Sequence, residues 1–354
     1  MAVELHRVSL RVGAETHIYE TDLSLQTGQF NILLGTTLSG KTTLMRLMAG
    51  LEKPTTGELR VNGEDVTGVP VQRRSVAMVY QAFINYPSFS VYDNIASPLK
   101  VAGLPKAEID EKVSRFAELL KLTPMLKRLP SELSGGQQQR TALARALVKG
   151  AELVLLDEPL ANLDYKLREE LRDELPRMFA DSGATVVYAT SEPLEALMLG
   201  GYTATLSQGR VIQFGPTSAI YRHPENLTSA QVFSDPPVNI AMIEKRGDSA
   251  YLNDSVSWNI PPQLARLPDG KYRIGLRPHH LSPNTGQVEV EGEVQIAEIS
   301  GSESIIRVNI EGNNWVSETH GIHGYEFGQR ASFFFDAERC LYFDADERLI
   351  DIGV

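Results

Sequence analysis

The feature that most constrains the fold of this chain is a glycine-containing loop between an apolar run and a helix-forming stretch. Residues 30–34 are apolar enough to predict a buried strand, and residues 42–48 have helical spacing. Between them, residues 35–42 read GTTLSGKT and fit the pattern G-x-x-x-x-G-K-[ST]. In such a loop, backbone N–H groups and the positive end of the helix surround the phosphates of a nucleotide. The sequence therefore predicts an α/β P-loop nucleotide-binding domain.

Two side chains of this loop have predicted roles toward ATP and Mg²⁺. Lys41 places a cation on the β- and γ-phosphates, and Thr42 offers its hydroxyl to Mg²⁺. The whole loop is expected to contact the nucleotide through Gly35, Thr36, Thr37, Leu38, Ser39, Gly40, Lys41, Thr42 and Thr43.

A second apolar strand, predicted at residues 153–156, ends in two adjacent carboxylates. Side chains at the carboxyl end of a strand reach the crevice in which an α/β sheet binds its ligands. Asp157 is expected to hold Mg²⁺ through water, and Glu158 to polarise the attacking water as a general base. Acidic residues commonly end strands, so the assignment depends on the phosphate loop.

The length of 354 residues favours two domains, and the sequence changes in character along the chain. Strands alternate with helices over about the first 220 residues, which predicts a mostly parallel sheet covered by helices. After Pro236 and Pro237, short alternating strands recur at 272–276, 288–299, 304–310 and 331–335. We therefore expect an α/β domain over residues 1–235 and an all-β domain over residues 236–354.

Composition limits the possible partners and location. The formal net charge of −11 argues against a nucleic-acid-binding surface, which is normally basic. Cys340 is the only cysteine, which fits a reducing cytoplasm, and the chain begins without a signal-peptide pattern. No run of about eighteen apolar residues is present, so any membrane contact is expected to be made through another protein.

Residues 133–140, LSGGQQQR, lie between the two nucleotide motifs and resemble the signature of ATP-binding-cassette ATPases. The resemblance implies a head-to-tail dimer in which this helix N-terminus closes on ATP held by the opposite subunit. The residues expected to contact that ATP are Ser134, Gly135, Gly136 and Gln137, together with Asp164, which resembles the family's D-loop aspartate.

Further landmarks agree with this family in order and spacing. Gln81 resembles its glutamine loop, which implies that Gln81 senses Mg²⁺ and the attacking water and relays nucleotide state to a helical subdomain at about residues 83–134. The segment from Tyr86 to Asn94 resembles the groove that receives a helix of an integral-membrane permease.

The β-rich half resembles the oligonucleotide-fold-like regulatory domain, of the TOBE type, found in MalK-like ATPases. The resemblance rests on residues 275–281 and 299–303. It implies the ATPase subunit of an importer for carbohydrate, polyol, glycerol or glycerol-phosphate-type solutes, with an extracytoplasmic solute-binding protein as an indirect partner. His279 and His280 suggest a metal site, but adjacent histidines without a third ligand are more often surface or packing residues.

Three positions depart from the family pattern. Ser191 occupies the position of the switch histidine and is too short to reach the γ-phosphate as an imidazole does. Val12 lies where an aromatic ring usually stacks on adenine, and Tyr19 is the expected substitute. Leu38 replaces a loop glycine, so its backbone is expected to avoid positive φ.

These departures all fall on the half-site for this subunit's own ATP. We therefore expect an ATPase coupled to transport, paired with a paralogous second ATPase in an asymmetric dimer and located on the cytoplasmic face of the bacterial inner membrane. The alternatives are a homodimeric importer ATPase and a largely non-hydrolysing structural partner. A cassette protein acting on ribosomes or DNA is disfavoured, because those usually carry two cassettes or a long coiled-coil insert.

Overall fold

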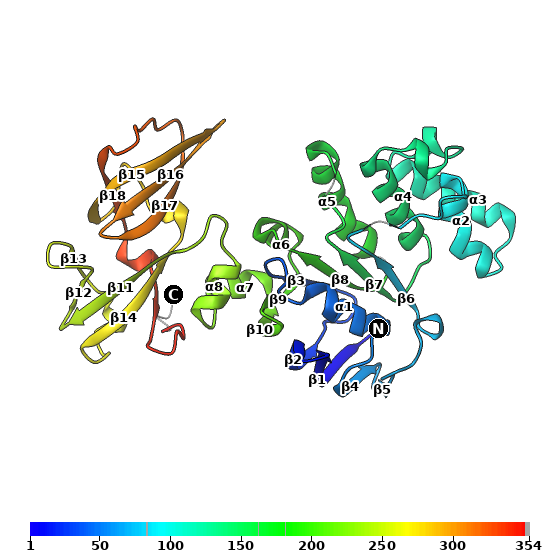
Figure 1. Ribbon diagram of the computed structural model, residues 1–354, viewed down its shortest axis with the longest axis horizontal. Coiled ribbons are helices and arrows are strands. Elements are labelled where there is room, and N and C mark those ends of the chain that lie inside the picture. Colours follow the sequence, from blue (N-terminus) through cyan, green and yellow to red (C-terminus); the bar gives the residue numbers. More distant parts are fainter. Residues whose placement is uncertain (83, 162, 181, 351–354) are drawn as a thin grey trace. The chain divides into compact units, whose positions relative to one another are not determined.

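The computed structural model describes residues 1–350 except 83, 162 and 181 (Figure 1). The chain forms two compact units, one over Met1–Ser218 and one beginning at Ala219. This division falls inside α7 (Thr217–Arg222), earlier than the change in sequence character at residues 235–236. The boundary drawn there from the sequence stays a prediction.

The first unit is built around a six-stranded sheet whose strands run mainly parallel. Its order is β10 (Arg210–Pro216), β9 (Tyr202–Ser207), β3 (Phe30–Leu34), β8 (Thr185–Thr190), β7 (Leu153–Asp157) and β6 (Val76–Val79). Of the described pairings in this sheet, β9 with β10 is antiparallel and the others are parallel. Every residue of β3, β7 and β8 is buried, as expected for strands covered on both faces.

A second, antiparallel sheet completes the core of this unit. It has the order β2 (Glu15–Ser24), β1 (Val3–Val12), β4 (Thr56–Val61) and β5 (Glu64–Asp65). Helix α1 (Lys41–Ala49) lies in the hydrophobic core shared by both sheets, where its Leu44 belongs to the same cluster as Leu5 of β1 and Leu155 of β7. The helix that follows the phosphate loop is therefore held from two sides.

Helices make up the rest of the first unit. They are α2 (Val91–Val101), α3 (Lys106–Leu119), α4 (Gly135–Leu147), α5 (Tyr165–Ala180) and α6 (Pro193–Leu199), with short 3₁₀ turns at Val71–Arg73, Thr123–Met125 and Pro130–Glu132. Helices α2, α3 and α4 contact one another and lie together in Figure 1. The expected helical segment at 83–134 contains α2 and α3, and its first residue, 83, is outside the described residues.

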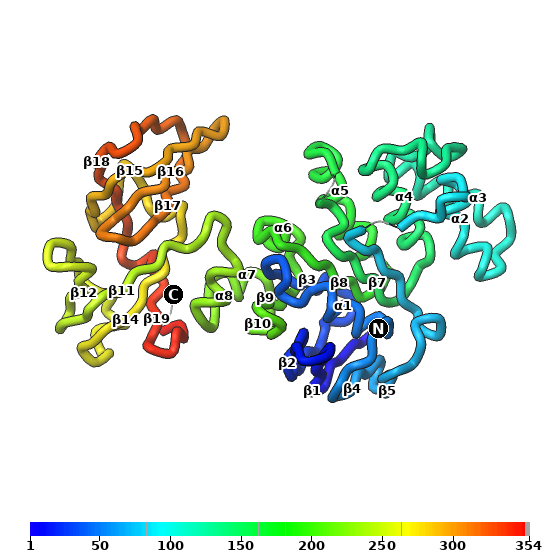
Figure 2. The backbone as a smooth tube through the Cα atoms, viewed as in Figure 1, coloured from blue at the N-terminus to red at the C-terminus, as the bar shows by residue number. Residues whose placement is uncertain are grey.

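The second unit consists of two antiparallel sheets and short helices. One sheet has the order β13 (Ser257–Asn259), β12 (Ser249–Tyr251), β11 (Asn239–Arg246), β14 (Gly270–Leu276) and β19 (Leu341–Phe343), the last labelled in Figure 2. The other has β17 (Asn313–His320), β16 (Glu303–Ile310), β15 (Val288–Ser300) and β18 (Arg330–Phe335). The helical pieces are α8 (Leu227–Val232) and the 3₁₀ turns Pro262–Leu264, Pro278–His280 and Ala337–Arg339.

Aromatic packing holds the two sheets of this unit together. The ring of Phe335 meets Trp258 edge-on at 5.4 Å and Trp315 at 6.1 Å between centroids. Such edge-to-face contacts add to the free energy gained from burying the rings. The predicted fold class, a P-loop α/β domain with a mostly parallel sheet followed by a β-rich domain, is confirmed.

Candidate nucleotide-binding site

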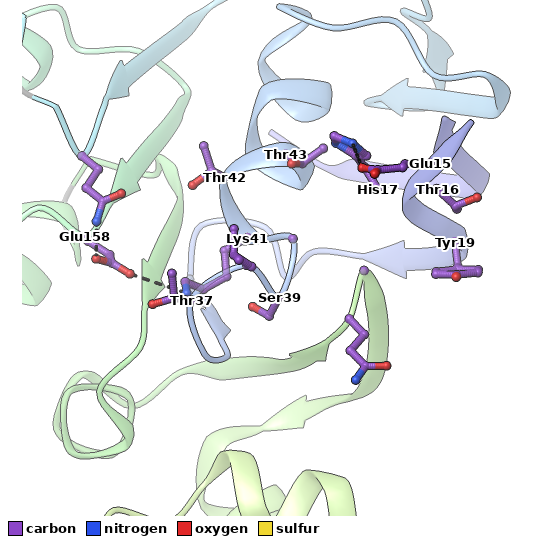
Figure 3. A pocket seen from close by; sticks show the side chains of 15 residues that line it. Glu15, Thr16, His17, Tyr19, Thr37, Ser39, Lys41, Thr42, Thr43 and Glu158 are labelled. Atoms are coloured by element: carbon purple, nitrogen blue, oxygen red, sulfur yellow. Dashed lines mark hydrogen bonds and ion pairs between the residues drawn. The ribbon is translucent and has the colours of Figure 1, made fainter. Parts of the chain in front are cut away.

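A pocket of about 640 Å³ lies where α1 begins (Figure 3). Its walls come from the phosphate loop, the start of β2, the ends of β6 and β7, and the β9–β10 turn. The lining residues are Glu15, Thr16, His17, Tyr19, Thr37, Leu38, Ser39, Gly40, Lys41, Thr42, Thr43, Gln81, Glu158, Gln208 and Gly209. Seven of the nine loop residues expected to contact a nucleotide therefore line one pocket, and the other two, Gly35 and Thr36, lie directly beside it.

Two glycines are required by the path of this loop. A Cβ on Gly35 would lie 2.5 Å from the carbonyl oxygen of Leu206. Gly40 caps α1 with φ 105°, and a Cβ there would lie 2.9 Å from Cδ1 of Ile18. Any other residue at these two positions would shift the loop away from the sheet, because neither backbone oxygens nor buried side chains yield easily.

The expectation that Leu38 avoids positive φ is wrong. Leu38 has φ 67°, in the left-handed region, and its side chain is 94% exposed. The loop must reverse direction here to reach Gly40, so the chain adopts the conformation that glycine favours even with a leucine present. This conformation costs about 1–2 kcal/mol for an L-residue, and no packing of the side chain offsets it.

Lys41 is a buried cation aimed at the loop. The residue is 5% exposed, and its Nζ donates to the carbonyl oxygens of Gly35 at 2.7 Å and Thr36 at 3.1 Å. Nζ also lies 3.5 Å from Oε1 of Glu158, which faces it in Figure 3. Burial lowers the pKa of Lys41, and the charge of Glu158 opposes that shift. An incoming phosphate would supply the negative charge that this ammonium group otherwise takes from Glu158.

Glu158 and Gln81 meet although they are far apart in sequence. The Nε2 of Gln81 donates to Oε2 of Glu158 at 2.8 Å. These residues follow β6 and β7, which are adjacent parallel strands, so their carboxyl ends open on the same edge of the sheet. The backbone of Glu158 has φ 46° and its N–H donates to the carbonyl of Ala189 at 3.0 Å, which holds the carboxylate in the pocket.

Thr42 and Asp157 form the third polar contact of the site. The Oγ1 of Thr42 donates to Oδ2 of Asp157 at 2.8 Å. Burial raises the pKa of Asp157, and the hydrogen bond from Thr42 opposes the shift. Asp157 itself does not line the pocket but reaches it through Thr42. Hydroxyl, carboxylate and amide oxygens from Thr42, Asp157 and Gln81 are the donor atoms that Mg²⁺ prefers.

Unpaired donors at the loop also fit a phosphate. The Oγ of Ser39 is buried and has no hydrogen-bond partner among the described residues. The first N–H groups of a helix have no acceptor within the helix, so the start of α1 presents further donors. A ligand rich in acceptor oxygens would satisfy both.

Tyr19 lines the pocket, whereas Val12 does not and is 52% exposed. The Tyr19 N–H donates to the carbonyl of Gly209 at 2.9 Å, and the guanidinium of Arg210 lies 3.7 Å from the centre of its ring. An aromatic ring that can stack on a base is therefore present at this wall of the pocket.

Five lining residues were missed by the sequence analysis: Glu15, Thr16, His17, Gln208 and Gly209. For His17 a signal existed, because it lies two residues before Tyr19 on a strand and therefore points to the same face. For the turn at Gln208 no signal existed, because only the fold brings that turn beside β2.

The signature residues and Asp164 lie outside this pocket. The Gln137 N–H donates to Oγ of Ser134 at 3.4 Å, and the Ser134 N–H donates to Oε1 of Gln137 at 3.0 Å, which caps α4 in both directions. Oδ1 of Asp164 accepts from the N–H of Leu167 at 3.0 Å at the start of α5. Both helix starts are exposed. The predicted roles of these residues toward a second subunit's ATP stay predictions.

Ser191 also lies outside the pocket and is exposed, directly after β8. Behind it, buried Glu195 accepts hydrogen bonds from Oγ1 of Thr190 at 2.6 Å and from the hydroxyl of Tyr188 at 3.2 Å. Burial raises the pKa of Glu195. Thr190 is thus tied to this buried cluster directly before Ser191, whose own side chain is short.

The segment from Tyr86 to Asn94 is organised by the buried amide of Asn94. Its Oδ1 accepts from the N–H of Tyr86 at 2.8 Å, and its Nδ2 donates to the carbonyls of Tyr86 at 3.1 Å, Phe89 at 3.0 Å and Ser90 at 3.0 Å. The rings of Tyr86 and Phe89 are 48% and 42% exposed and lie 5.3 Å apart. The loop therefore presents two neighbouring aromatic side chains on a rigid frame.

Together, the fold and this pocket define a P-loop nucleotide-binding cassette. Residues 18–161 match the family described as ABC transporter, and residues 274–343 match the TOBE domain. The described part of the chain contains no helix long and apolar enough to cross a membrane.

Similar proteins agree with this class. The chain is 36% identical over 352 residues to the trehalose/maltose import ATP-binding protein MalK of Thermococcus litoralis, which covers 94% of each chain. It is 34% identical to the maltose/maltodextrin import ATP-binding protein MalK of Vibrio vulnificus, over 92% of this chain and 91% of that one. The chain therefore belongs to the ATP-binding proteins of ATP-binding-cassette transporters.

Solved structures support the same class. The post-hydrolysis dimer of the ATP-binding cassette MJ0796 bound to ADP and Pi is similar with a TM-score of 0.56 and 27% identity, covering 61% of this chain and 98% of that one.

Proposed function

We propose that this chain is the ATP-hydrolysing subunit of an importer for a carbohydrate or a related polyol, glycerol or glycerol-phosphate-type solute. The observation that carries the proposal is the contact of one carboxylate, Glu158, with both Lys41 and Gln81 inside the pocket. A phosphate-binding cation and a polar residue able to sense the reacting centre thereby both contact the carboxylate that would act as general base.

In this function Lys41, the Ser39 hydroxyl and the first N–H groups of α1 bind the phosphates of ATP. Thr42, Asp157 and Gln81 would hold Mg²⁺, which when bound neutralises charge that develops on the phosphate oxygens. The ammonium group of Lys41 then pairs with phosphate instead of with Glu158. The released Glu158 carboxylate orients a water molecule and accepts its proton as that water attacks the γ-phosphorus. The bond from the γ-phosphorus to the β–γ bridging oxygen breaks, and this oxygen leaves with ADP. Tyr19 supplies the adenine platform.

The solute class is supported by similarity rather than by the site itself. The two relatives described above are named as import proteins for trehalose, maltose or maltodextrin. The aromatic surface from Tyr86 to Asn94 is suited to receive a short helix of a permease, since exposed aromatic rings on a rigid frame dominate many interfaces. Through the permease, this chain lies at the cytoplasmic face of the membrane and acts on an extracytoplasmic solute-binding protein indirectly.

The dimer in this proposal is asymmetric. Ser191 offers no imidazole to this subunit's own site, whereas Ser134 and Gly135 keep the features needed to complete a partner's site. The similarity to a dimeric cassette supports pairing in general. A homodimer that uses Glu158 and Gln81 alone, and a largely non-hydrolysing partner, are the competing forms.

Turnover of ATP distinguishes these forms. The asymmetric form predicts slow turnover by the isolated chain and an increase of about 10²-fold in its Ser191→His variant, because one preorganised contact commonly contributes 10²–10³ in rate. The Ser114→His variant, at an exposed position on α3, is the matched control and should leave turnover unchanged. Fast turnover by the unmodified chain, unaltered by Ser191→His, would show a self-sufficient homodimer.

In the reconstituted transporter, each subunit's general-base glutamate is then replaced in turn. Loss of transport only when the partner's glutamate is replaced fits the asymmetric dimer. Equal loss from both replacements contradicts it.

A further inference from the structure

The second unit contains its own pocket of about 470 Å³, at the carboxyl end of β14 and beside β19. It shares no residue with the nucleotide pocket. The lining residues are Tyr221, Arg222, His223, Arg277, His279, His280, Glu338, Arg339, Cys340, Leu341, Tyr342, Leu349 and Ile350. The lining therefore includes three arginines and one carboxylate, together with three histidines, in a chain whose formal net charge is −11.

Arg277 is a buried arginine of this pocket. It is 6% exposed, donates to the carbonyl oxygens of Tyr221 at 2.5 Å and Phe233 at 3.2 Å, and lies 3.8 Å from the centre of the Tyr221 ring. Burial lowers its pKa, but guanidinium stays charged in proteins. Its contacts with protein are neutral carbonyls and a ring face, so none of these contacts cancels its positive charge.

The two adjacent histidines face this charge. Their ring centres are 4.3 Å apart, and Nδ1 of His280 is buried without a hydrogen-bond partner among the described residues. Burial lowers the pKa of His280 to about 4, with the charges of His279, Arg339 and Arg277 acting in the same direction and that of Asp336 opposing them. Burial also lowers the pKa of His279, again assisted by Arg277 and Arg339.

A metal ion does not account for this group. The described residues contain no set of three or more histidine, cysteine, aspartate or glutamate side chains placed to hold one. The positive charges of Arg277 and Arg339 would also repel a cation.

The remaining walls are apolar or aromatic. Leu341, Leu349, Ile350 and Tyr342 also line the pocket, and the volume lies within the usual range for small-molecule sites. The pocket therefore combines several donors for an anion with a surface that can cover a carbon skeleton.

We propose that this pocket binds a small organic phosphate monoester, with the phosphate against Arg277, Arg339 and His280 and the organic part against Tyr342 and Leu341. A carboxylate has only two oxygens to accept hydrogen bonds from these three side chains. A phosphate monoester has three terminal oxygens, one for each of them. Neutral sugars would leave the arginine charges unpaired.

Phenyl phosphate is a suitable probe, and the chain provides a local reporter. Both tryptophans, Trp258 and Trp315, belong to the second unit, and Nε1 of Trp258 donates to the hydroxyl of Tyr342 at 3.2 Å. Phenyl phosphate is expected to bind the full-length chain by calorimetry and to change tryptophan fluorescence over the same concentrations. Binding by inorganic phosphate should be weaker, and phenol should not bind measurably.

Three variants separate this site from the nucleotide pocket. Arg339→Gln and His280→Gln should each weaken phenyl phosphate binding about tenfold or more, since a hydrogen bond to a charged group is lost. Lys41→Ala, which removes the cation of the nucleotide pocket, should leave the affinity unchanged. Arg307→Gln removes an exposed arginine of β16 outside the pocket and should also have no effect.

Several results would overturn the proposal. Loss of binding in Lys41→Ala would show that the probe binds in the nucleotide pocket. Unchanged affinity in both Arg339→Gln and His280→Gln would show that these side chains do not bind the anion. Phenol binding as tightly as phenyl phosphate would indicate a merely apolar pocket. Inorganic phosphate binding as tightly would exclude recognition of the ester's organic part.

Discussion

Lys41 Nζ and Glu158 Oε1 lie 3.5 Å apart, although one residue begins a helix and the other follows a strand. Both side chains are largely buried, with side-chain exposures of 6% and 17%. The pair keeps a buried cation compensated when no phosphate is bound, because an uncompensated buried charge is strongly destabilising. In the proposed function, binding of ATP and activation of Glu158 would therefore be linked through the side chain of Lys41.

Replacing Lys41 tests the phosphate site. Lys41→Ala should weaken ATP binding by roughly 30-fold or more, because truncating one partner of a buried charge pair costs about 2 kcal/mol or more. Calorimetric titration with Mg-ATP measures the effect. Lys112→Ala, on the outer surface of α3, should bind ATP as the unmodified chain does. Equal affinities for Lys41→Ala and the unmodified chain would show that the loop does not hold phosphate.

Replacing Glu158 separates binding from hydrolysis. Glu158→Gln keeps the hydrogen-bonding shape but cannot accept the proton of water, so turnover at this chain's own site should fall by about 10²–10⁴ while ATP is still bound. Turnover by the isolated Ser191→His chain, with and without Glu158→Gln, measures the rate at that site. Glu152→Gln, an exposed glutamate just before β7, is the matched control. If Glu158→Gln retained full turnover in every assembly in which this chain's site is active, another residue would be the base.

Asn94 is expected to couple the stability of its loop to docking of the permease. Asn94→Ala removes the acceptor of the Tyr86 N–H and the donor to the Phe89 carbonyl, which should lower the free energy of unfolding by about 2–4 kcal/mol. Denaturant titration measures that loss, and co-purification with the permease measures docking. Ser88→Ala, exposed in the same loop, should change neither quantity. If Asn94→Ala bound the permease as the unmodified chain does, permease binding would not depend on this aromatic surface.

The pH dependence of stability in the second unit should depend on His280. Its folded-state pKa of about 4 lies below the ordinary value of 6.5, so between these pH values the unfolded chain takes up a proton that the folded chain does not. The free energy of unfolding should therefore fall as pH falls from about 6.5 to 4. His280→Gln removes this contribution, so its stability should decline less than that of the unmodified chain.

Tryptophan fluorescence during denaturant titration at several pH values measures this difference, because both tryptophans lie in the second unit. The exposed His320 provides the control, and His320→Gln should keep the wild-type dependence. Parallel curves for His280→Gln and the unmodified chain would contradict a buried, neutral His280.

Local sequence determined the phosphate loop, the strands beside it and the β-rich character of the second unit. Residues 30–34 form β3 as predicted, because an uninterrupted apolar run has no exposed face in a sheet covered on both sides. Gly40 has φ 105°, a conformation that favours glycine. Such features depend on interactions close in sequence, so a linear motif is enough to predict them.

Only the tertiary structure decided which distant residues share a site. Gln81 reaches Glu158 because β6 pairs with β7, and Gln208 reaches the nucleotide pocket because β10 turns back beside β2. The backbone of Leu38 is likewise set by the closure of the loop rather than by its own preference. The pocket around Arg277 and His280 depends on pairing of β14 with β19, whose residues lie far apart in the chain. Long-range pairing of strands fixes these neighbours, and no pattern within a short window of sequence encodes it.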